Sequence, residues 1–168
     1  KNTHGGASPS PAILKAMLIN GSVEMTGANV TAPRPNGGEG WGRMNLGNVL
    51  NTGAQVGYLD QTNALSSVGD VFTFNAAVAD TARPLRITLV WTDPPGVSDP
   101  ALVNDLDLEV TVGASTFRGN VFSGGFSTTG GVFDNRNNIE NVWLAPGIAA
   151  ATPINVTVRA TALNGDGI

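Results

Sequence analysis

The feature that most constrains the fold of this chain is a two-residue alternation of apolar and polar side chains that recurs through its second half. Such alternation places the apolar side chains on one face of an extended strand and the polar side chains on the other. Turn-forming residues separate the alternating segments, so the sequence predicts at least six strands. The predicted strands are residues 72–76, 85–91, 106–112, a short segment around Phe117, 139–144 and 154–161.

The short lengths and close spacing of these strands determine the expected fold class. Short strands joined by tight turns are typical of antiparallel folds, and residues 113–116 (GAST) give the clearest hairpin signal. The composition agrees, with 22 glycines, 10 prolines and 13% charged residues among 168. We therefore expect a mainly β domain, built as an antiparallel jelly roll or β-sandwich barrel.

One helix is predicted ahead of the strands, over residues 11–20. Ser10 can cap its N-terminus, Pro11 suits the first helical position, and Gly21 suits a left-handed stop. A helix of this length is marginal alone in water, so it needs a surface to pack on. Its apolar side chains recur at helical spacing. They are Ile13, Leu14, Met17 and Leu18.

A Gly/Trp segment follows, in which Gly40 and Gly42 flank Trp41. Glycine on both sides of a large aromatic residue allows close backbone approach or positive φ. Residues 53–70 have no clear periodicity and are predicted to be a connector. We therefore divide the chain at this change of character, into residues 1–52 with the helix and residues 53–168 with the β domain.

Two acidic segments hold the candidate binding residues. In residues 103–110 (VNDLDLEV), three carboxylates lie on one face of the predicted strand, and residues 134–142 (DNRNNIENV) are again rich in side-chain oxygens. Carboxylates on one face repel one another unless a cation, a nearby arginine such as Arg136, or water lies among them. Calcium takes six to eight oxygen ligands of these kinds. The candidate calcium ligands are Asp105, Asp107, Asp134, Asn135, Asn138 and Glu140.

The same residues also have a purely structural interpretation. Asp105 and Asp134 can cap turns, Arg136 can pair with a carboxylate, and Asn137 and Asn138 can satisfy loop backbone groups. Spacing alone leaves both interpretations open. The three tryptophans are interpreted as packing residues, although one at the end of a strand could also stack on a sugar. They are Trp41, Trp91 and Trp143.

Composition excludes several classes of function. A formal charge of −4 and a pI near 4.7 disfavour a nucleic-acid partner. The chain has no cysteine, so it has neither disulfides nor a thiolate zinc site. No apolar run is long enough to span a membrane, and we expect no signal peptide within these residues. Few lysines with abundant Asn, Thr and Gly suit a secreted protein.

The segments PSPAILKAMLING (residues 9–21) and GWGRMNL (residues 40–46), with several motifs after them, resemble secreted subtilisin-like serine proteases of peptidase family S8. These two segments are similar to the last helix and the closing segment of the catalytic domain. The later motifs are similar to the C-terminal β-barrel of the alkaline, oxidant-resistant type, and all stand in the family's order. They are residues 84–95 (PLRITLVWTDPP), 102–108 (LVNDLDL), 118–120 (RGN) and 134–142.

The chain departs from the family at its catalytic residues. The family's serine motif, G-T-S-M-A-x-P, does not occur in the sequence, and the only histidine, His4, stands in a Gly-rich stretch. A Ser-His-Asp triad needs a histidine oriented by a carboxylate beside the serine. We therefore expect no catalytic residues and no peptidase activity in this chain, and we expect His4 to be an exposed bystander.

The resemblance implies a non-catalytic C-terminal fragment of a secreted endopeptidase, with a barrel that stabilises the catalytic domain and binds calcium. The expected partners are the parent's own catalytic domain and its protein substrate. Both ends are expected to be internal to a longer chain, with the barrel truncated after residues 164–167 (NGDG). The alternative is a free-standing β-sandwich module that binds carbohydrate or protein, which leaves the helix and the Gly/Trp segment unexplained.

Overall fold

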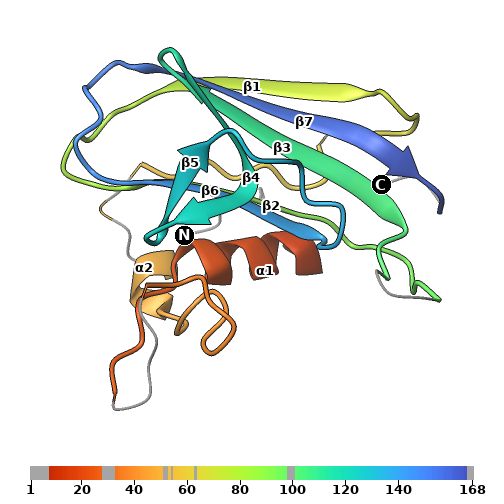
Figure 1. Ribbon diagram of the computed structural model, residues 1–168, viewed down its shortest axis with the longest axis horizontal. Helices are drawn as coiled ribbons and strands as arrows, with labels where there is room; N and C mark the ends of the chain where they lie inside the picture. The colour runs from red at the N-terminus through yellow and green to blue at the C-terminus, as the bar shows by residue number, and fades with distance from the viewer. Residues whose placement is uncertain are drawn as a thin grey trace.

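The protein is mainly β, with antiparallel sheets and little helix (Figure 1). The computed structural model describes residues 8–27, 33–50, 53, 55–62, 64–97 and 101–165. The predicted bystander His4 lies outside these residues, as does the end of the predicted C-terminal turn from Asp166. Within the described part of the chain, no helix has the length and apolar character needed to cross a membrane.

All six predicted strands are present, and the structure adds a seventh, β5. The added strand is only four residues long, and its burial does not alternate, so sequence periodicity missed it. A short helix, α2 (Leu46–Leu50), was also not predicted. The strands are β1 (Val71–Ala77), β2 (Leu85–Val90), β3 (Asn104–Val112), β4 (Ser115–Ser123), β5 (Phe126–Thr129), β6 (Ile139–Leu144) and β7 (Pro153–Leu163).

The strands form two sheets and, among the described residues, no closed barrel. The larger sheet has the order β1-β7-β3-β4-β5, and the smaller pairs β2 with β6. The predicted hairpin turn is confirmed, because β3 pairs with β4 from Val112 and Ser115 outward. Gly113 takes the left-handed conformation that this turn needs, with φ +59°. The architecture is therefore sandwich-like.

The apolar core lies between the two sheets. The inward positions of β3, including Leu108 and Val110, are fully buried and pack with Val142 of β6. Trp91 is 3% exposed, and its indole N–H donates to the carbonyl of Asn104 at 3.0 Å. Trp143 is also buried, as predicted. The apolar side chains that alternate along β3 therefore face the core, as the sequence pattern predicted.

The predicted helix is α1 (Pro11–Asn20), with Ser10 as its N-cap accepting a hydrogen bond from the Ile13 N–H at 3.1 Å. Two details of the prediction were wrong. Gly21 has φ −80°, so its stop is not left-handed. Glycine is needed there for space, because a Cβ would lie 2.7 Å from Val49 Cγ2. The predicted apolar stripe is not the buried face either, since α1 buries Ala16 and Ile19.

The segment around Trp41 connects the amino-terminal part to the smaller sheet. Gly40 and Gly42 both have positive φ, and a Cβ on Gly42 would lie 2.5 Å from the Val23 carbonyl oxygen. Both predicted reasons for these glycines therefore hold. The Trp41 ring meets the Trp143 ring edge to face, with centroids 5.5 Å apart.

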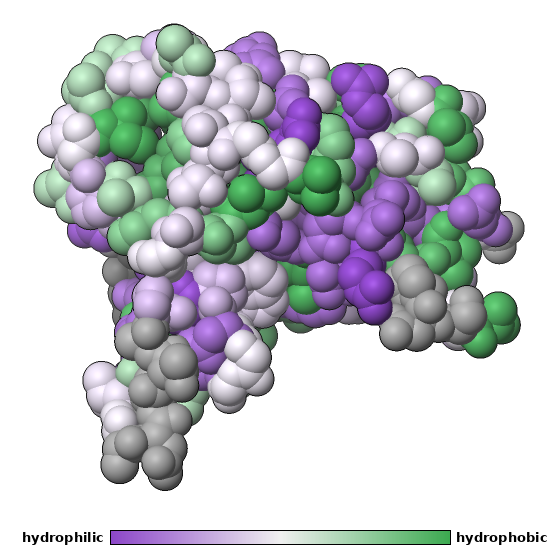
Figure 2. Space-filling view, in the orientation of Figure 1, coloured by the Kyte–Doolittle hydropathy of each residue, from purple (hydrophilic) through white to green (hydrophobic). Residues whose placement is uncertain are grey.

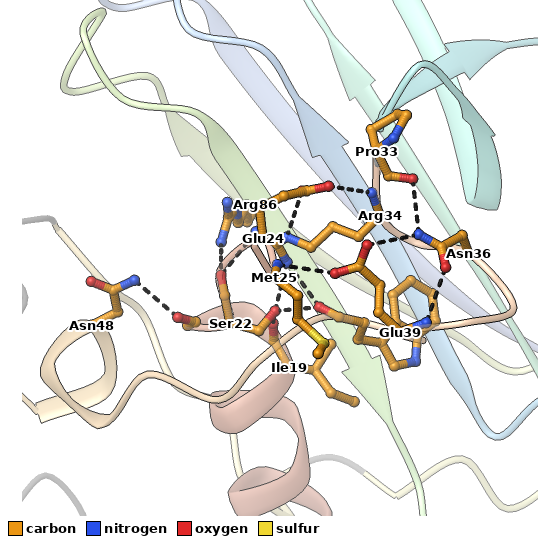
Figure 3. Close-up of polar contacts among 12 residues, drawn as sticks. Ile19, Ser22, Glu24, Met25, Pro33, Arg34, Asn36, Glu39, Asn48 and Arg86 are labelled. Atoms are coloured by element: carbon orange, nitrogen blue, oxygen red, sulfur yellow. Dashed lines mark hydrogen bonds and ion pairs between the residues drawn. The ribbon is translucent and has the colours of Figure 1, made fainter. Parts of the chain in front are cut away.

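Two arginines complete this connection (Figure 3). The Ser22 carbonyl accepts from Arg34 Nη2 at 2.9 Å and from Arg86 Nη1 of β2 at 3.0 Å. Both guanidinium groups also lie over the Trp143 ring, 4.8 and 5.2 Å from its centroid. Figure 1 shows α1 against the smaller sheet, with the larger sheet on the far side of the sandwich.

Candidate metal centre

The candidate site lies where β4 departs from β3. The two strands pair only as far as Glu109 and Arg118, after which β4 turns away at Gly119 and Asn120. The Leu108 N–H points toward the position that β4 has left. The carboxylate of Glu140, from β6, takes that place and accepts this hydrogen bond at 2.6 Å.

Gly119 makes room for this carboxylate. A Cβ at this position would lie 2.1 Å from Glu140 Oε2, so no other residue fits while Glu140 points inward. Glu140 is fully buried, with an exposed fraction of 0%. Local geometry therefore holds this carboxyl group in the gap of the larger sheet, at a position where water does not reach it.

Burial and mutual repulsion both act on these carboxyl groups. Burial, first, and then the charges of Asp107 and Asp134 raise the pKa of Asp105 to about 6. Burial raises the pKa of Glu140 to about 9, and the nearby aspartates add to the effect, against the hydrogen bond from Leu108. The pKa of Asp107 is also raised, chiefly by burial. Protonation of these carboxyl groups, or binding of a cation among them, would therefore lower the free energy of the folded protein.

Three oxygens of this cluster have no hydrogen-bond partner within the described residues. They belong to three different side chains, and each oxygen atom is buried. Buried polar atoms are normally satisfied, so an unpartnered group costs about 1–3 kcal/mol. The three oxygens are Asp105 Oδ1, Asp107 Oδ1 and Glu140 Oε1.

Asp134 lies near the other carboxylates and also caps its own turn. Its Oδ1 accepts from the Arg136 backbone N–H at 2.9 Å, and its Oδ2 accepts from Asn137 Nδ2 at 2.7 Å. Its charge nevertheless contributes to the raised pKa of Asp105 and of Glu140. The turn-capping and charge-cluster interpretations thus both describe this residue.

The two remaining predicted ligands, Asn135 and Asn138, lie differently. Asn135 is exposed. Asn138 lies between the end of β2 and α1. Its Nδ2 donates to the carbonyl of Trp91, just after β2, at 3.1 Å, and its Oδ1 accepts from Lys15 Nζ of α1 at 3.4 Å. Of the six residues predicted from the sequence, the four carboxylates therefore act on one another, whereas Asn138 connects the loop to the helix.

Asn120 and Thr161 contribute to the site but were not among the predicted residues. Asn120 has φ +61°, and its side chain binds three groups: Asp134 Oδ2, the Ile139 carbonyl and the Asn141 N–H, all at 2.5–3.0 Å. Thr161 donates its hydroxyl hydrogen to Asp107 Oδ2. The Gly119-Asn120 pair inside an alternating strand was the available signal, because it marks an irregular backbone.

The donors of this cluster are of the kind that hard cations prefer. The cluster contains only carboxylate, amide and hydroxyl oxygens, which calcium prefers. As the side chains stand, no three His, Cys, Asp or Glu residues within the described part of the chain surround a single point closely enough to hold a metal. Binding would therefore require the carboxylates to draw together, with backbone or water oxygens completing the shell.

Comparison with known proteins gives one informative similarity. No protein-family model matches the chain. Over 151 residues it is 30% identical to the Serine protease/ABC transporter B family protein tagA of Dictyostelium discoideum. The match covers 83% of this chain but only 8% of that protein. The chain is thus similar to a small part of a much longer, protease-named protein.

Proposed function

We propose that this chain is the non-catalytic C-terminal part of a secreted subtilisin-like serine endopeptidase, in which a calcium-binding β domain stabilises the catalytic domain. The ordered motifs of residues 9–21, 40–46 and 102–108 support it, as does the similarity to a protease-named protein. In this proposal, the chain contributes stability, and the catalytic serine belongs to the preceding part of the parent. Residues 1–52 would belong to the catalytic domain and residues 53–168 to the β domain.

The observation that carries the calcium part is the set of buried carboxylate oxygens without partners. Burying several carboxylates side by side is unfavourable unless protons or a cation neutralise them. A calcium ion bound by Asp105, Asp107, Asp134 and Glu140 would offset two of their negative charges and ligate the open oxygens. The ion would also join β3, β6 and the turn at Asp134, and so add its binding free energy to folding.

The packing part of the proposal is supported by the outer surface of α1. A cavity of about 570 Å³ with an almost entirely apolar lining opens beside the helix, between Leu14, Leu18 and Met44. Leu14 is 46% exposed and Met44 is 64% exposed, and Leu50 of α2, a helix that contacts α1, is 72% exposed. Large exposed apolar patches mark surfaces that pack against another protein body. In the proposed parent, the catalytic domain covers this surface.

Thermal unfolding with EGTA and with excess calcium tests the metal site. Because a ligand that binds only the folded state raises stability, the melting temperature should be higher in calcium. Asp107→Asn and Asp134→Asn should each abolish the difference. Equal melting temperatures for the unmodified protein in EGTA and calcium would refute the calcium site.

The coding sequence upstream of residue 1 tests whether the chain belongs to a larger serine endopeptidase. The proposal expects a G-T-S-M-A-x-P segment shortly before the helix, preceded by the remaining catalytic residues. The chain alone should not cleave a fluorogenic peptide. Turnover that persists after repurification, and is abolished by a serine-directed inhibitor, would contradict the assignment of a non-catalytic fragment.

A further inference from the structure

A second, polar cavity lies on the outer face of the larger sheet, away from the core. It has a volume of about 160 Å³. Two strands form its floor, with Asp107 opposite Arg159 and Glu109 opposite Thr157 in the β3–β7 register. Phe133, from the loop between β5 and β6, lines the cavity as well. Figure 2 shows hydrophilic residues gathered on the face over which β3 and this loop run.

The charged groups around this cavity remain apart although opposite charges face each other across the strands. Within the described residues, the side chains of Glu109 and Arg159 form no hydrogen bond. The charge of Arg159 acts on Asp107, but no ion pair joins the two side chains. Arg118, directly opposite Glu109, instead lies over the Phe133 ring at 4.5 Å from its centroid and donates to the Gly131 carbonyl. The cavity is therefore lined by donors and acceptors that are available to a ligand.

The cavity has both acidic and basic side chains in its surroundings, and this combination limits which ligands it can bind. A cation would be attracted by Glu109 but opposed by Arg159 and Arg118, and an anion would meet the reverse. A hydroxyl group both donates and accepts, so a ring bearing several hydroxyls satisfies carboxylate and guanidinium together. The ring's C–H face matches an aromatic surface such as Phe133. The volume corresponds to about five water molecules, which suits one ring and not an extended chain.

We propose that this cavity binds a single neutral sugar ring, with Glu109 and the hydroxyl oxygen of Thr157 accepting its hydroxyl hydrogens, Arg159 donating to its oxygens, and Phe133 covering its apolar face. The hydroxyl hydrogen of Thr157 is itself donated to Asn155 Oδ1 at 3.1 Å. This site lies on the same strands as the carboxylate cluster, but it uses different groups. Asp107 Oδ2 accepts from Thr161, and the sugar contacts rest on the other four residues. The inference holds whether or not the chain belongs to a protease.

A nuclear magnetic resonance titration of the labelled protein tests the site. The probes are the methyl glycosides of glucose, galactose, mannose and N-acetylglucosamine, each added in calcium and again in EGTA. We expect at least one glycoside to shift the amides of residues 107–109, 157–159 and 131–133 in a saturable manner. A disaccharide of the same sugar that binds more tightly identifies a glycan residue as the ligand, and equal affinity identifies the single sugar.

Matched variants assign the contacts. Glu109→Gln and Arg159→Gln keep the side-chain size but remove the charge, and each should weaken binding about tenfold. Asn75→Ala, on the same sheet face but outside the cavity, should leave the affinity unchanged, and the same spectra report whether each variant folds. Two results of these experiments would overturn the inference: no glycoside shifts these amide signals, or Glu109→Gln binds as tightly as the unmodified protein. Binding of a simple cation (lysine amide) or a simple anion (acetate) in place of the glycosides would overturn it as well.

Discussion

Replacing Glu140 by glutamine should raise the stability of the metal-free protein at pH 8 and remove the stabilisation that calcium gives. The folded protein holds a proton on Glu140 up to a pKa of about 9, whereas the unfolded chain releases it near 4.5. Between these values the folded state binds more protons, so the free energy of unfolding falls as the pH rises. Glutamine carries no such proton and removes this dependence.

The size of the effect follows from the same pKa values. At pH 8, holding the proton costs roughly 5 kcal/mol relative to an ordinary glutamate, at about 1.36 kcal/mol per pH unit. Glutamine avoids this cost, but its amide NH2 group would find no acceptor there and costs about 1–3 kcal/mol, so the net gain is about 2–4 kcal/mol. In EGTA, Glu140→Gln should therefore be more stable by an amount in this range at pH 8 but no more stable at pH 5, where holding the proton costs less than about 1 kcal/mol. In calcium, the variant should lose the stabilisation that the unmodified protein gains.

Urea unfolding followed by tryptophan fluorescence measures all of these quantities, at both pH values and with both additives. Glu109→Gln is the matched control, because the carboxylate it removes lies on the same face of β3 as Asp105 and Asp107 but does not act on the Glu140 carboxyl. A destabilisation of Glu140→Gln in EGTA that is equal at pH 5 and pH 8 would refute the reasoning. That result would mean that the carboxylate contributes shape and hydrogen bonding without an unfavourable charge.

Three further changes test other parts of the structure. Asn120→Ala should lower the free energy of unfolding by about 2–3 kcal/mol in urea, because partly buried hydrogen bonds are lost and φ +61° disfavours alanine. Asn120→Gly should lose less, and equal losses would argue against backbone strain. Arg34→Ala should cost about 3 kcal/mol by the same assay, since it leaves the Ser22 and Trp41 carbonyls with fewer donors, and Arg34→Lys should not restore it. Met44→Ser with Leu50→Ser should leave the urea midpoint unchanged, because both side chains are exposed, and a lowered midpoint would place them in the core.

Sequence reasoning succeeded where local patterns determine the structure. Strand periodicity located six strands, and the N-cap at Ser10 with Pro11 located the start of α1. It failed where contacts between distant parts of the chain determine the structure. The pairing of β2 with β6 in a separate sheet depends on packing that no local pattern encodes. The buried face of α1 also depends on contact with β2, because the helix is apolar on more than one side.

The candidate site shows the same division. Alternation alone placed Asp105 and Asp107 on one face of β3, and richness in oxygen-bearing side chains singled out Asp134 and Glu140. The insertion of Glu140 into the gap left by β4 could not be predicted, since it requires the strand to bend away at Asn120. Asn138 was interpreted as a possible ligand because sequence does not reveal which way a loop side chain points. In the structure it faces α1.

The most direct test of the proposed calcium centre is calorimetric titration of the metal-free protein with calcium chloride. The account predicts one saturable site per chain, and predicts that Asp105→Asn and Glu140→Gln each abolish it while Glu109→Gln preserves it. An absence of saturable binding by the folded protein, or binding that both cluster variants retain, would contradict the account.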